Sequence, residues 1–353
     1  MTTLHRFRRL ACFAAALLPA VPIAPSCRRS PAELIEQRRE VLGTTFVIRV
    51  FAAPSDDLYS AAGKAFDRID AVARLAGEAD PEGDVARLNR AAGQDPVAVA
   101  PETLRALQVA TEVAAAGGGA LDPTWGVLRD AWRFDGVEQF DPEQEAFRAK
   151  VARLREKVDY RNVEIDAEAG TVRLTQRGMQ IGLEPIAKGL ALDEAVAVLE
   201  AHGVRDFVVE GGGDLVVRGR RGDRDWTVGI RHPRREAPEV FALFPMRDRA
   251  IATTGDYERF RIIGARRYSH VIDPRTGYPA HACVSATVIH PWAIVAAALA
   301  TAVFVLGPAD GMALVRKYEG AEAVVVDRNL GVHVTPGLVG AVRVRWLKAG
   351  AGH

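Results

Sequence analysis

The stretch from Tyr268 to Pro279, Tyr-Ser-His-Val-Ile-Asp-Pro-Arg-Thr-Gly-Tyr-Pro, combines ionisable side chains with turn-forming residues. His270 can take up a proton near neutral pH, which suits it to deprotonate an incoming hydroxyl. Asp273-Pro274 and Thr276-Gly277 are typical of tight turns, so we expect His270 to lie where a strand runs into a stiff loop. The alternative is a hydrogen-bonded loop histidine beside an ordinary turn, and the other motifs of the chain decide between the two.

Three further segments suggest places where a ligand approaches the backbone. Residues 182–189, Gly-Leu-Glu-Pro-Ile-Ala-Lys-Gly, lead into a helix expected from about Leu190 to His202, and amides at its start together with Lys188 would bind a phosphate-bearing ligand. After three glycines, Asp122 and Thr124 would face a flat ligand, or they cap a helix start. The glycines of Glu-Gly-Gly-Gly-Asp at 210–214 either approach a ligand or close a tight hairpin.

The composition argues against some classes of protein. The chain has 353 residues, enough for one large domain or two, and a formal net charge of +1, so no global field attracts nucleic acid. We therefore expect no nucleic-acid partner. The three cysteines are Cys12, Cys27 and Cys283, which leave no obvious disulfide after removal of a signal and cannot form a cysteine metal site.

The N-terminus has the layout of a secretory signal. Arg6, Arg8 and Arg9 precede an apolar run from Leu10 to Ala24 that is too short and too interrupted by proline for a transmembrane helix. We therefore predict export to the periplasm. Cys27 is a possible lipid attachment site, although Ala24 stands where a large aliphatic residue is usual, so an anchored and a free chain both stay open. The predicted parts are a signal peptide at 1–26, a charged tether at 27–39 and a functional domain at 40–347.

Helices and mostly short strands interleave along the remaining chain. Thr44 to Ala53 reads as a strand with alternating apolar residues. Helices are expected at Asp56 to about Ala76, Asp84–Ala91, Pro101 to Gly117, Gln144–Val158, Leu190–His202, Trp292–Leu306 and Asp310–Tyr318. The apolar segment 292–306 is shorter than the roughly 20 residues that span a bilayer, so we expect a buried core helix there. This interleaving predicts an α+β fold without a clean internal boundary.

Seven short motifs, in order, resemble those of the FAD:protein FMN transferase (ApbE) family. They are Leu-Gly-Thr-Thr at 42, Leu-Asp-Pro-Thr at 121, Ile-Ala-Lys-Gly at 186, Gly-Gly-Asp-Leu at 212, Thr-Gly-Asp-Tyr at 254, His-Val-Ile-Asp-Pro-Arg-Thr-Gly at 270 and Leu-Ala-Thr-Ala-Val-Phe-Val-Leu-Gly at 299. The resemblance implies a single large domain of mixed sheets and helices around a flavin cleft. It also implies a periplasmic, often lipid-anchored, magnesium-dependent enzyme. Such an enzyme transfers FMN from FAD to a threonine or serine hydroxyl of an acceptor protein and releases AMP. Acceptors in the family include flavin-carrying subunits of membrane redox complexes.

The resemblance also implies roles for individual residues. His270 would take the proton from the acceptor hydroxyl, and Lys188 would hold the pyrophosphate of FAD. Further contacts to FAD would come from Leu42, Gly43, Ala120, Leu121, Asp122, Thr124 and Ile272. Magnesium (Mg2+) would bind oxygen ligands that include Thr301 and the backbone carbonyl of Pro185. Thr301 could instead bond back to its own helix.

The chain departs from the family pattern at the implied metal site. The last motif helix of the family usually reads Ala-Asp-Ala-Leu-Ala-Thr, and Ala297 stands in the place of its metal-binding aspartate. Glu184 could supply the missing charge from another direction. Leu42 replaces a common methionine, and Glu210 replaces an asparagine. Two other functions therefore stay open: a noncatalytic periplasmic flavin-binding protein, which Ala297 favours, and a hydrolase that splits the FAD pyrophosphate with water.

Overall fold

The computed structural model describes residues 31–77, 80–134, 141–235, 239–340 and 343–344. The predicted signal peptide and Cys27 lie outside the described residues. Within the described ranges, no helix combines the length and the apolar character needed to cross a bilayer.

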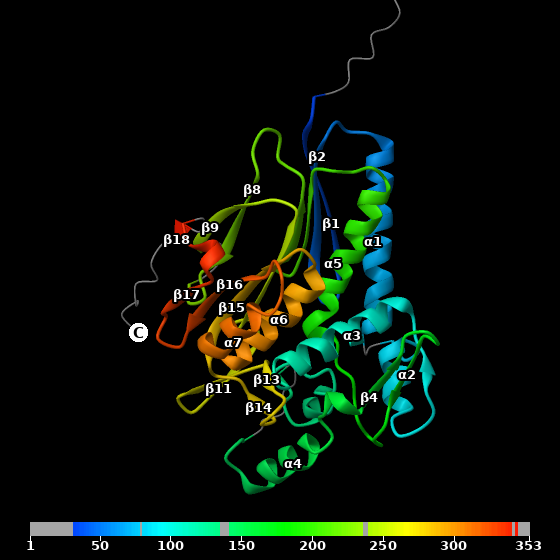
Figure 1. Ribbon diagram of the computed structural model, residues 1–353, viewed down its shortest axis with the longest axis vertical. Helices are drawn as coiled ribbons and strands as arrows, with labels where there is room; N and C mark the ends of the chain where they lie inside the picture. Colours follow the sequence, from blue (N-terminus) through cyan, green and yellow to red (C-terminus); the bar gives the residue numbers. More distant parts are fainter. Residues whose placement is uncertain (1–30, 78–79, 135–140, 236–238, 341–342, 345–353) are drawn as a thin grey trace, which may run out of the picture.

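An eight-stranded antiparallel sheet forms the middle of the molecule, with strand order β1-β2-β6-β7-β10-β15-β16-β17 (Figure 1). Its strands are β1 Glu33–Val41, β2 Thr44–Ala52, β6 Phe207–Gly211, β7 Asp214–Arg218, β10 Arg249–Gly255, β15 Cys283–His290, β16 Glu322–Asp327 and β17 Val332–Val334. Tight turns join β1 to β2 and β6 to β7, and β2 pairs directly with β6. Both turns therefore come to the same end of the sheet.

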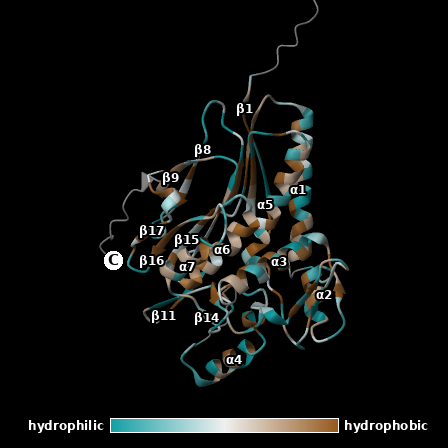
Figure 2. Cartoon of the chain, viewed as in Figure 1, coloured by the Kyte–Doolittle hydropathy of each residue, from teal (hydrophilic) through white to brown (hydrophobic). Residues whose placement is uncertain are grey.

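Helices cover one face of this sheet (Figure 1). They are α1 Asp56–Ala76, α3 Pro101–Ala116, α5 Glu184–Ala201, α6 Ala293–Leu306 and α7 Pro308–Val315, while α2 Asp84–Arg90 and α4 Glu145–Arg155 belong to the lower part of the molecule. The central helix α6 packs against α3, α5, α7, β10 and β15. It is surrounded by protein, which explains why it is apolar on all sides (Figure 2).

The opposite face of the large sheet is covered by a three-stranded sheet in the order β18 Arg343–Val344, β9 Val240–Met246 and β8 Trp226–Arg231. A second core lies between the two sheets, where Val217 and Val324 of the large sheet join a cluster with Phe244 of β9. The molecule thus has a helical layer, a large sheet and a small sheet, with one core in each interface. This arrangement confirms the predicted α+β class.

Smaller elements form the lower part of the molecule. They are the sheet β3 Val97–Ala98, β5 Thr171–Leu174 and β4 Val163–Asp166, the hairpin β11 Phe260–Ile263 with β12 Arg266–Ser269, the hairpin β13 Ile272–Asp273 with β14 Tyr278–Pro279, and the 3-10 helices η1 Gly126–Asp130 and η2 Tyr160–Asn162. The third 3-10 helix, η3 Pro336–Leu338, instead packs against β16, and its Leu338 belongs to the core between the two sheets. Trp132, Tyr268 and Ile272 belong to a third core there. This third core supports the loop that carries His270.

Several predicted elements differ from the structure. The segment 33–39, predicted as part of a tether, belongs to β1, whose exposed and half-buried residues alternate as in a sheet-edge strand. The helix predicted from Leu190 begins at Glu184. No strand was predicted over Cys283–His290, because all its residues are buried and the alternation that marks a half-exposed strand is absent. The other helices begin within a few residues of the predicted positions.

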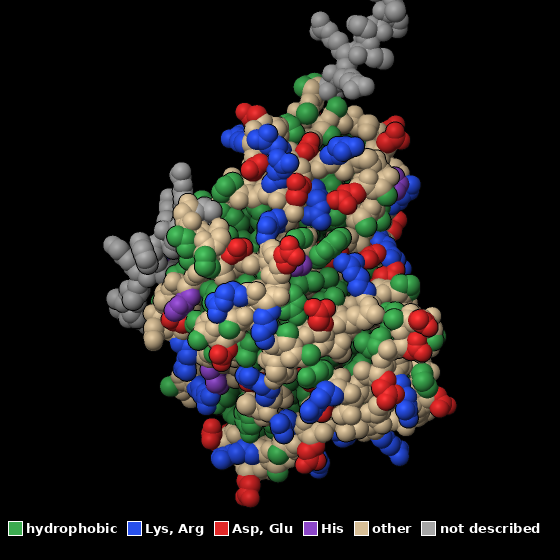
Figure 3. Space-filling view, in the orientation of Figure 1, with side chains coloured by type: hydrophobic (Ala, Val, Ile, Leu, Met, Phe, Trp, Pro, Cys, Tyr) green, Lys and Arg blue, Asp and Glu red, His purple; other side chains and the backbone are tan. Residues whose placement is uncertain are grey.

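The surface carries both signs of charge. On the face shown in Figure 3, Lys and Arg side chains are interspersed with Asp and Glu side chains. This mixture agrees with the net charge of +1. The absence of a nucleic-acid partner stays a prediction.

Candidate active site

His270 follows the last residue of β12 and is half-buried, as predicted for a histidine where a strand meets a loop. Its backbone N–H donates to the carbonyl oxygen of Arg259 at 3.0 Å, and its Nδ1 lies 3.1 Å from the same oxygen. A carbonyl oxygen only accepts, so Nδ1 carries the proton and Nε2 is the proton acceptor. Burial, with the positive charges of Arg259 and Lys188, lowers the pKa of His270 to about 4. The imidazole is therefore neutral near pH 7.

The loop after His270 is stiffened by its own side chains. The Asp273 carboxylate accepts hydrogen bonds from the backbone N, Nε and Nη2 of Arg275 at 3.0, 2.9 and 2.8 Å. The amide N of Gly277 donates to the Asp273 carbonyl at 2.8 Å, and Trp132 Nε1 donates to the Gly277 carbonyl at 2.7 Å. Asp273 and Arg275 thus shape the turn that holds the histidine.

Lys188 of α5 and Asp214 of β7 form an ion pair. Lys188 Nζ lies 3.0 Å from Asp214 Oδ2, and the lysine side chain is 30% exposed while that of the aspartate is 5% exposed. The second carboxylate oxygen accepts from the backbone N–H of Thr253 at 2.9 Å. The charge of Lys188 also contributes to the low pKa of His270, so the two side chains interact electrostatically.

Two tight turns lie next to Lys188. Leu42 and Gly43, between β1 and β2, have φ of 53° and 68°, and the two glycines between β6 and β7 have φ of 58° and 91°. Positive φ at both central residues is the geometry favoured in two-residue hairpins, and it is strained at Leu42. A Cβ on Gly212 would lie 3.1 Å from Thr44 Oγ1 and 3.4 Å from Lys188 Cδ. The turn at Gly212 thus lies beside Lys188 and beside Thr44, the residue that follows Leu42 and Gly43.

The start of α5 differs from the prediction that Lys188 adjoins free helix amides. Because α5 begins at Glu184, Lys188 projects from inside the helix. Pro185 occupies the first turn, where its missing N–H removes no helical hydrogen bond. The Glu184 carboxylate forms an ion pair with Arg129, whose guanidinium lies 4.9 Å from the centre of the Trp125 ring.

The helices α5 and α6 are in close contact directly after Lys188, at Gly189 and Asp193. A Cβ on Gly189 would lie 2.5 Å from the carbonyl oxygen of Ala293, so the close helix contact requires glycine. The Asp193 carboxylate accepts from the backbone N–H groups of Ala293 and Ile294 at 2.8 and 3.1 Å and so caps α6 from a neighbouring helix. Burial raises the pKa of Asp193 to about 6.

Asp122 and Thr124 turn their side chains into the protein. Asp122 Oδ1 accepts from Thr124 N at 2.8 Å and Oγ1 at 2.6 Å, and Oδ2 accepts from Tyr160 N at 2.8 Å. Burial raises the pKa of Asp122. These hydrogen bonds form the capped turn that was the alternative interpretation. Neither side chain faces open space, in contrast to the prediction that both face a flat ligand. Ala120 and Leu121 are also buried, so a flavin contact along 120–124 would come from the backbone.

Comparisons with known proteins agree with this geometry. A sequence profile of the ApbE family matches residues 42–325. The chain belongs to the ApbE family. It is 32% identical over 320 residues to the FAD:protein FMN transferase of Treponema pallidum, covering 86% of this chain and 87% of the relative. It is 28% identical to the protein of the same name from Klebsiella pneumoniae, covering 90% of this chain and 93% of the relative.

Solved ApbE structures have the same fold. The ApbE protein of Thermotoga maritima aligns with a TM-score of 0.77 at 29% identity, covering 88% of this chain and 100% of the other. The flavin transferase ApbE from Vibrio cholerae aligns with a TM-score of 0.76 at 26% identity and the same coverage. The architecture described above is therefore that of the ApbE family.

The residues present do not fit the magnesium site that the resemblance implies. Thr301 Oγ1 donates to the carbonyl of Ala297 at 3.2 Å and lies 3.3 Å from Thr254 Oγ1. Glu184 is paired with an arginine, and Pro185 offers only a backbone oxygen. In the described part of the chain, no three His, Cys, Asp or Glu side chains converge. A hard dication prefers carboxylate oxygens, and this cluster offers neutral ones.

Other residues of the site were not assigned from the sequence. Asp214 ends the Gly-Gly-Gly-Asp run, but nothing in the sequence pairs it with Lys188. Arg259 acts through its backbone carbonyl, and Asp193 acts on a residue 100 positions away, so neither carried a local signal. Ile272, a predicted FAD contact, is 6% exposed and packs in the third core. Its contact with a ligand stays a prediction.

Proposed function

We propose that this chain is an FAD:protein FMN transferase that transfers FMN from FAD to a Thr or Ser hydroxyl of an acceptor protein. Its similarity along most of the length of proteins with that name supports the activity. The observation that carries the proposal is the neutral His270, whose Nε2 is the proton acceptor and whose pKa is lowered in part by the charge of Lys188. That combination suits attack of a hydroxyl on a phosphate.

In the proposed reaction, the acceptor hydroxyl oxygen attacks the phosphorus of the FMN half of FAD. A new oxygen–phosphorus bond forms while the bond from that phosphorus to the bridging oxygen breaks. AMP leaves with the bridging oxygen, and Nε2 of His270 takes the hydroxyl proton. The products are the FMN phosphoester of the acceptor and AMP. No oxidant or reductant is required.

Lys188 supplies the positive charge in this scheme. Its charge stabilises the pyrophosphate oxygens as negative charge shifts toward the leaving AMP. Asp214 holds the lysine in place through the 3.0 Å ion pair and is itself fixed by Thr253 N–H. The turn at Leu42 and Gly43 and the backbone at 120–124 would line the flavin. No step is routed through a metal ion, because Thr301 is a neutral group bonded to its own helix and the Glu184 carboxylate is paired with Arg129.

A noncatalytic flavin-binding protein is the second candidate. Ala297 favours it, because a methyl group stands where the family usually has the metal-binding aspartate. FAD hydrolysis to FMN and AMP is distinguished from both by its products.

The location and the acceptor are also part of the proposal. The N-terminal sequence pattern supports export to the periplasm, with a possible lipid anchor at Cys27. A flavin-carrying subunit of a membrane redox complex is the acceptor class that fits such a location.

The test is incubation of the purified protein with FAD and a Thr-containing acceptor domain of a flavin-carrying redox subunit, with magnesium or with chelator. In the sample with magnesium, we expect a fluorescent acceptor band on a denaturing gel and AMP release in equal amount. Loss of both in the sample with chelator would show that the transfer depends on a metal ion. An acceptor domain with its Thr changed to Val is the matched control. AMP without a fluorescent band would indicate hydrolysis, and bound FAD without AMP would indicate the flavin-binding function.

A further inference from the structure

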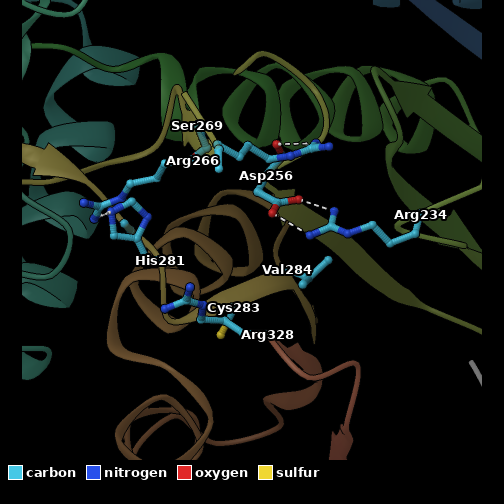
Figure 4. A pocket seen from close by; sticks show the side chains of 11 residues that line it. Arg234, Asp256, Arg266, Ser269, His281, Cys283, Val284 and Arg328 are labelled. Carbon is cyan, nitrogen blue, oxygen red and sulfur yellow. Dashed lines mark hydrogen bonds and ion pairs between the residues drawn. The ribbon is translucent and has the colours of Figure 1, made fainter. Parts of the chain in front are cut away.

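A cavity of about 440 Å³ lies behind the strand that leads to His270 (Figure 4). Its floor is formed by buried residues, which are Ser269, Ala280, Cys283 and Val284, and its rim includes Arg234, Asp256, Arg266, Arg267, His281 and Arg328. The cavity is thus separate from the site of Lys188 and His270, neither of which lines it.

The lining is strongly cationic. Four arginines and one carboxylate line the cavity, a formal charge of +3 when His281 is neutral. Asp256 neutralises Arg234 through a bidentate pair of 2.6 and 2.7 Å. Among the described residues, no carboxylate pairs with Arg266, Arg267 or Arg328. The positive charges of these three guanidinium groups are therefore not neutralised by an ion pair.

Two of these arginines are already held in position. Arg266 donates to His281 Nε2, and its guanidinium lies 5.2 Å from the centre of the Tyr268 ring. The guanidinium of Arg267 lies 3.8 Å from the centre of the Phe260 ring. Burial, with the charges of Arg266 and Arg328, lowers the pKa of His281, so this histidine stays neutral and accepts the bond. Positioned guanidinium groups lose less entropy when they bind.

The floor provides a buried hydroxyl without a hydrogen-bond partner. Ser269 is 2% exposed, and its Oγ makes no hydrogen bond to any of the described residues. Buried hydroxyl groups are normally satisfied, which points to a ligand that accepts from Ser269. Cys283 adds no negative charge, because burial raises the pKa of its thiol to about 12.

We propose that this cavity binds a small multivalent oxyanion of the phosphate-monoester class. Arg266, Arg267 and Arg328 bind its oxygens, and the Ser269 hydroxyl donates from the floor. A tetrahedral phosphate group presents enough oxygens for these donors, whereas a single carboxylate presents two. The site is independent of the proposed FMN transfer, and its ligand is either free phosphate or a phosphate group on a larger molecule.

The test is calorimetric titration of the full chain at low ionic strength with inorganic phosphate, phenyl phosphate and succinate. We expect saturable binding of one phosphate or phenyl phosphate per chain, in free and in FAD-saturated protein alike, and weaker binding of succinate. Tighter phenyl phosphate would identify an esterified phosphate as the ligand, and tighter inorganic phosphate the free ion. The Arg266→Gln/Arg328→Gln variant should lower affinity about 100-fold and Ser269→Ala about 5-fold, as expected for lost charged and neutral hydrogen bonds.

The matched control is Arg220→Gln/Arg247→Gln, which removes equal charge from a separate surface cavity and should leave the affinity unchanged. Arg328→Gln alone, at an exposed position, replaces the double variant if that one fails to fold. Absence of saturable binding, an equal loss in the control, competition by FAD, or tighter binding of succinate would each overturn the proposal. None of these readouts depends on FMN transfer.

Discussion

Replacing Lys188 by methionine separates its structural role from its proposed catalytic role. The exposure of the ion pair with Asp214 is intermediate. Exposed pairs contribute up to about 1 kcal/mol to stability, and disruption of buried pairs costs about 3–5 kcal/mol. Asp214 keeps its hydrogen bond from Thr253 N at 2.9 Å, so the remaining charge is partly compensated. We therefore expect Lys188→Met to lower the free energy of unfolding by about 2 kcal/mol, measured by urea denaturation.

The effect on activity should be larger. A preorganised charge at a transferring phosphate typically contributes about 3–4 kcal/mol to the transition state, so kcat/KM for FMN transfer should fall by about 100- to 1000-fold. The assay is the initial rate of fluorescent acceptor formation at saturating acceptor. Lys317→Met is the matched control, because Lys317 is exposed and donates only to the Ala116 carbonyl at 2.9 Å.

The double variant Lys188→Met/Asp214→Asn distinguishes the two roles. Removing the carboxylate charge should restore the free energy of unfolding, because no uncompensated buried charge remains. Activity should stay low, because the cation is still missing. Recovery of both quantities, or full activity of Lys188→Met itself, would refute the role of Lys188 at the pyrophosphate.

Three further predictions follow from the site. Protonation of His270 removes the proton acceptor, and its pKa is lowered to about 4, so kcat/KM should fall only as pH drops toward about 4; a fall through the ordinary value of 6.5 would contradict this. Gly189→Ala would stabilise an isolated helix by about 1 kcal/mol. In this protein it should instead lower the free energy of unfolding by about 1–3 kcal/mol, because the added Cβ would lie 2.5 Å from the Ala293 carbonyl oxygen. A rise in the urea midpoint of the variant would exclude the steric argument. Ala297→Asp places a carboxylate one turn before Thr301, and titration of the FAD-bound protein with magnesium should show affinity raised by about 10-fold or more. Unchanged affinity would contradict the view that Ala297 leaves this site unfit for magnesium.

The sequence predicted the elements whose pattern is local. α1 begins after Ser55, which accepts from Leu58 N, and α6 was recognised from its apolar run. β15 was missed because it is buried on both faces and therefore lacks alternation. β1 was missed because its charged residues suggested a tether, although pairing with β2 satisfies its backbone. Both strands form because they pair with neighbouring strands, and their local sequence patterns do not show this pairing.

At the site, the motif residues were found but their partners were not. The position of His270 after a strand was predicted from turn residues, whereas the carbonyl of Arg259 that fixes its proton was not. Asp122 and Thr124 were expected to face a ligand, but they satisfy one another in a buried turn. Side-chain direction in a loop depends on which backbone groups need partners, and spacing alone does not reveal it.

The most direct test of the proposed chemistry compares wild type with His270→Ala by intact-mass measurement of the acceptor domain after incubation with FAD. We expect the wild type to add one FMN per acceptor and the variant to transfer about 100-fold or more slowly, with FAD still bound, because general-base catalysis is lost. Thermal unfolding of both proteins checks that the variant is folded. FMN transfer at the wild-type rate by folded His270→Ala would contradict the assignment of His270 as the base.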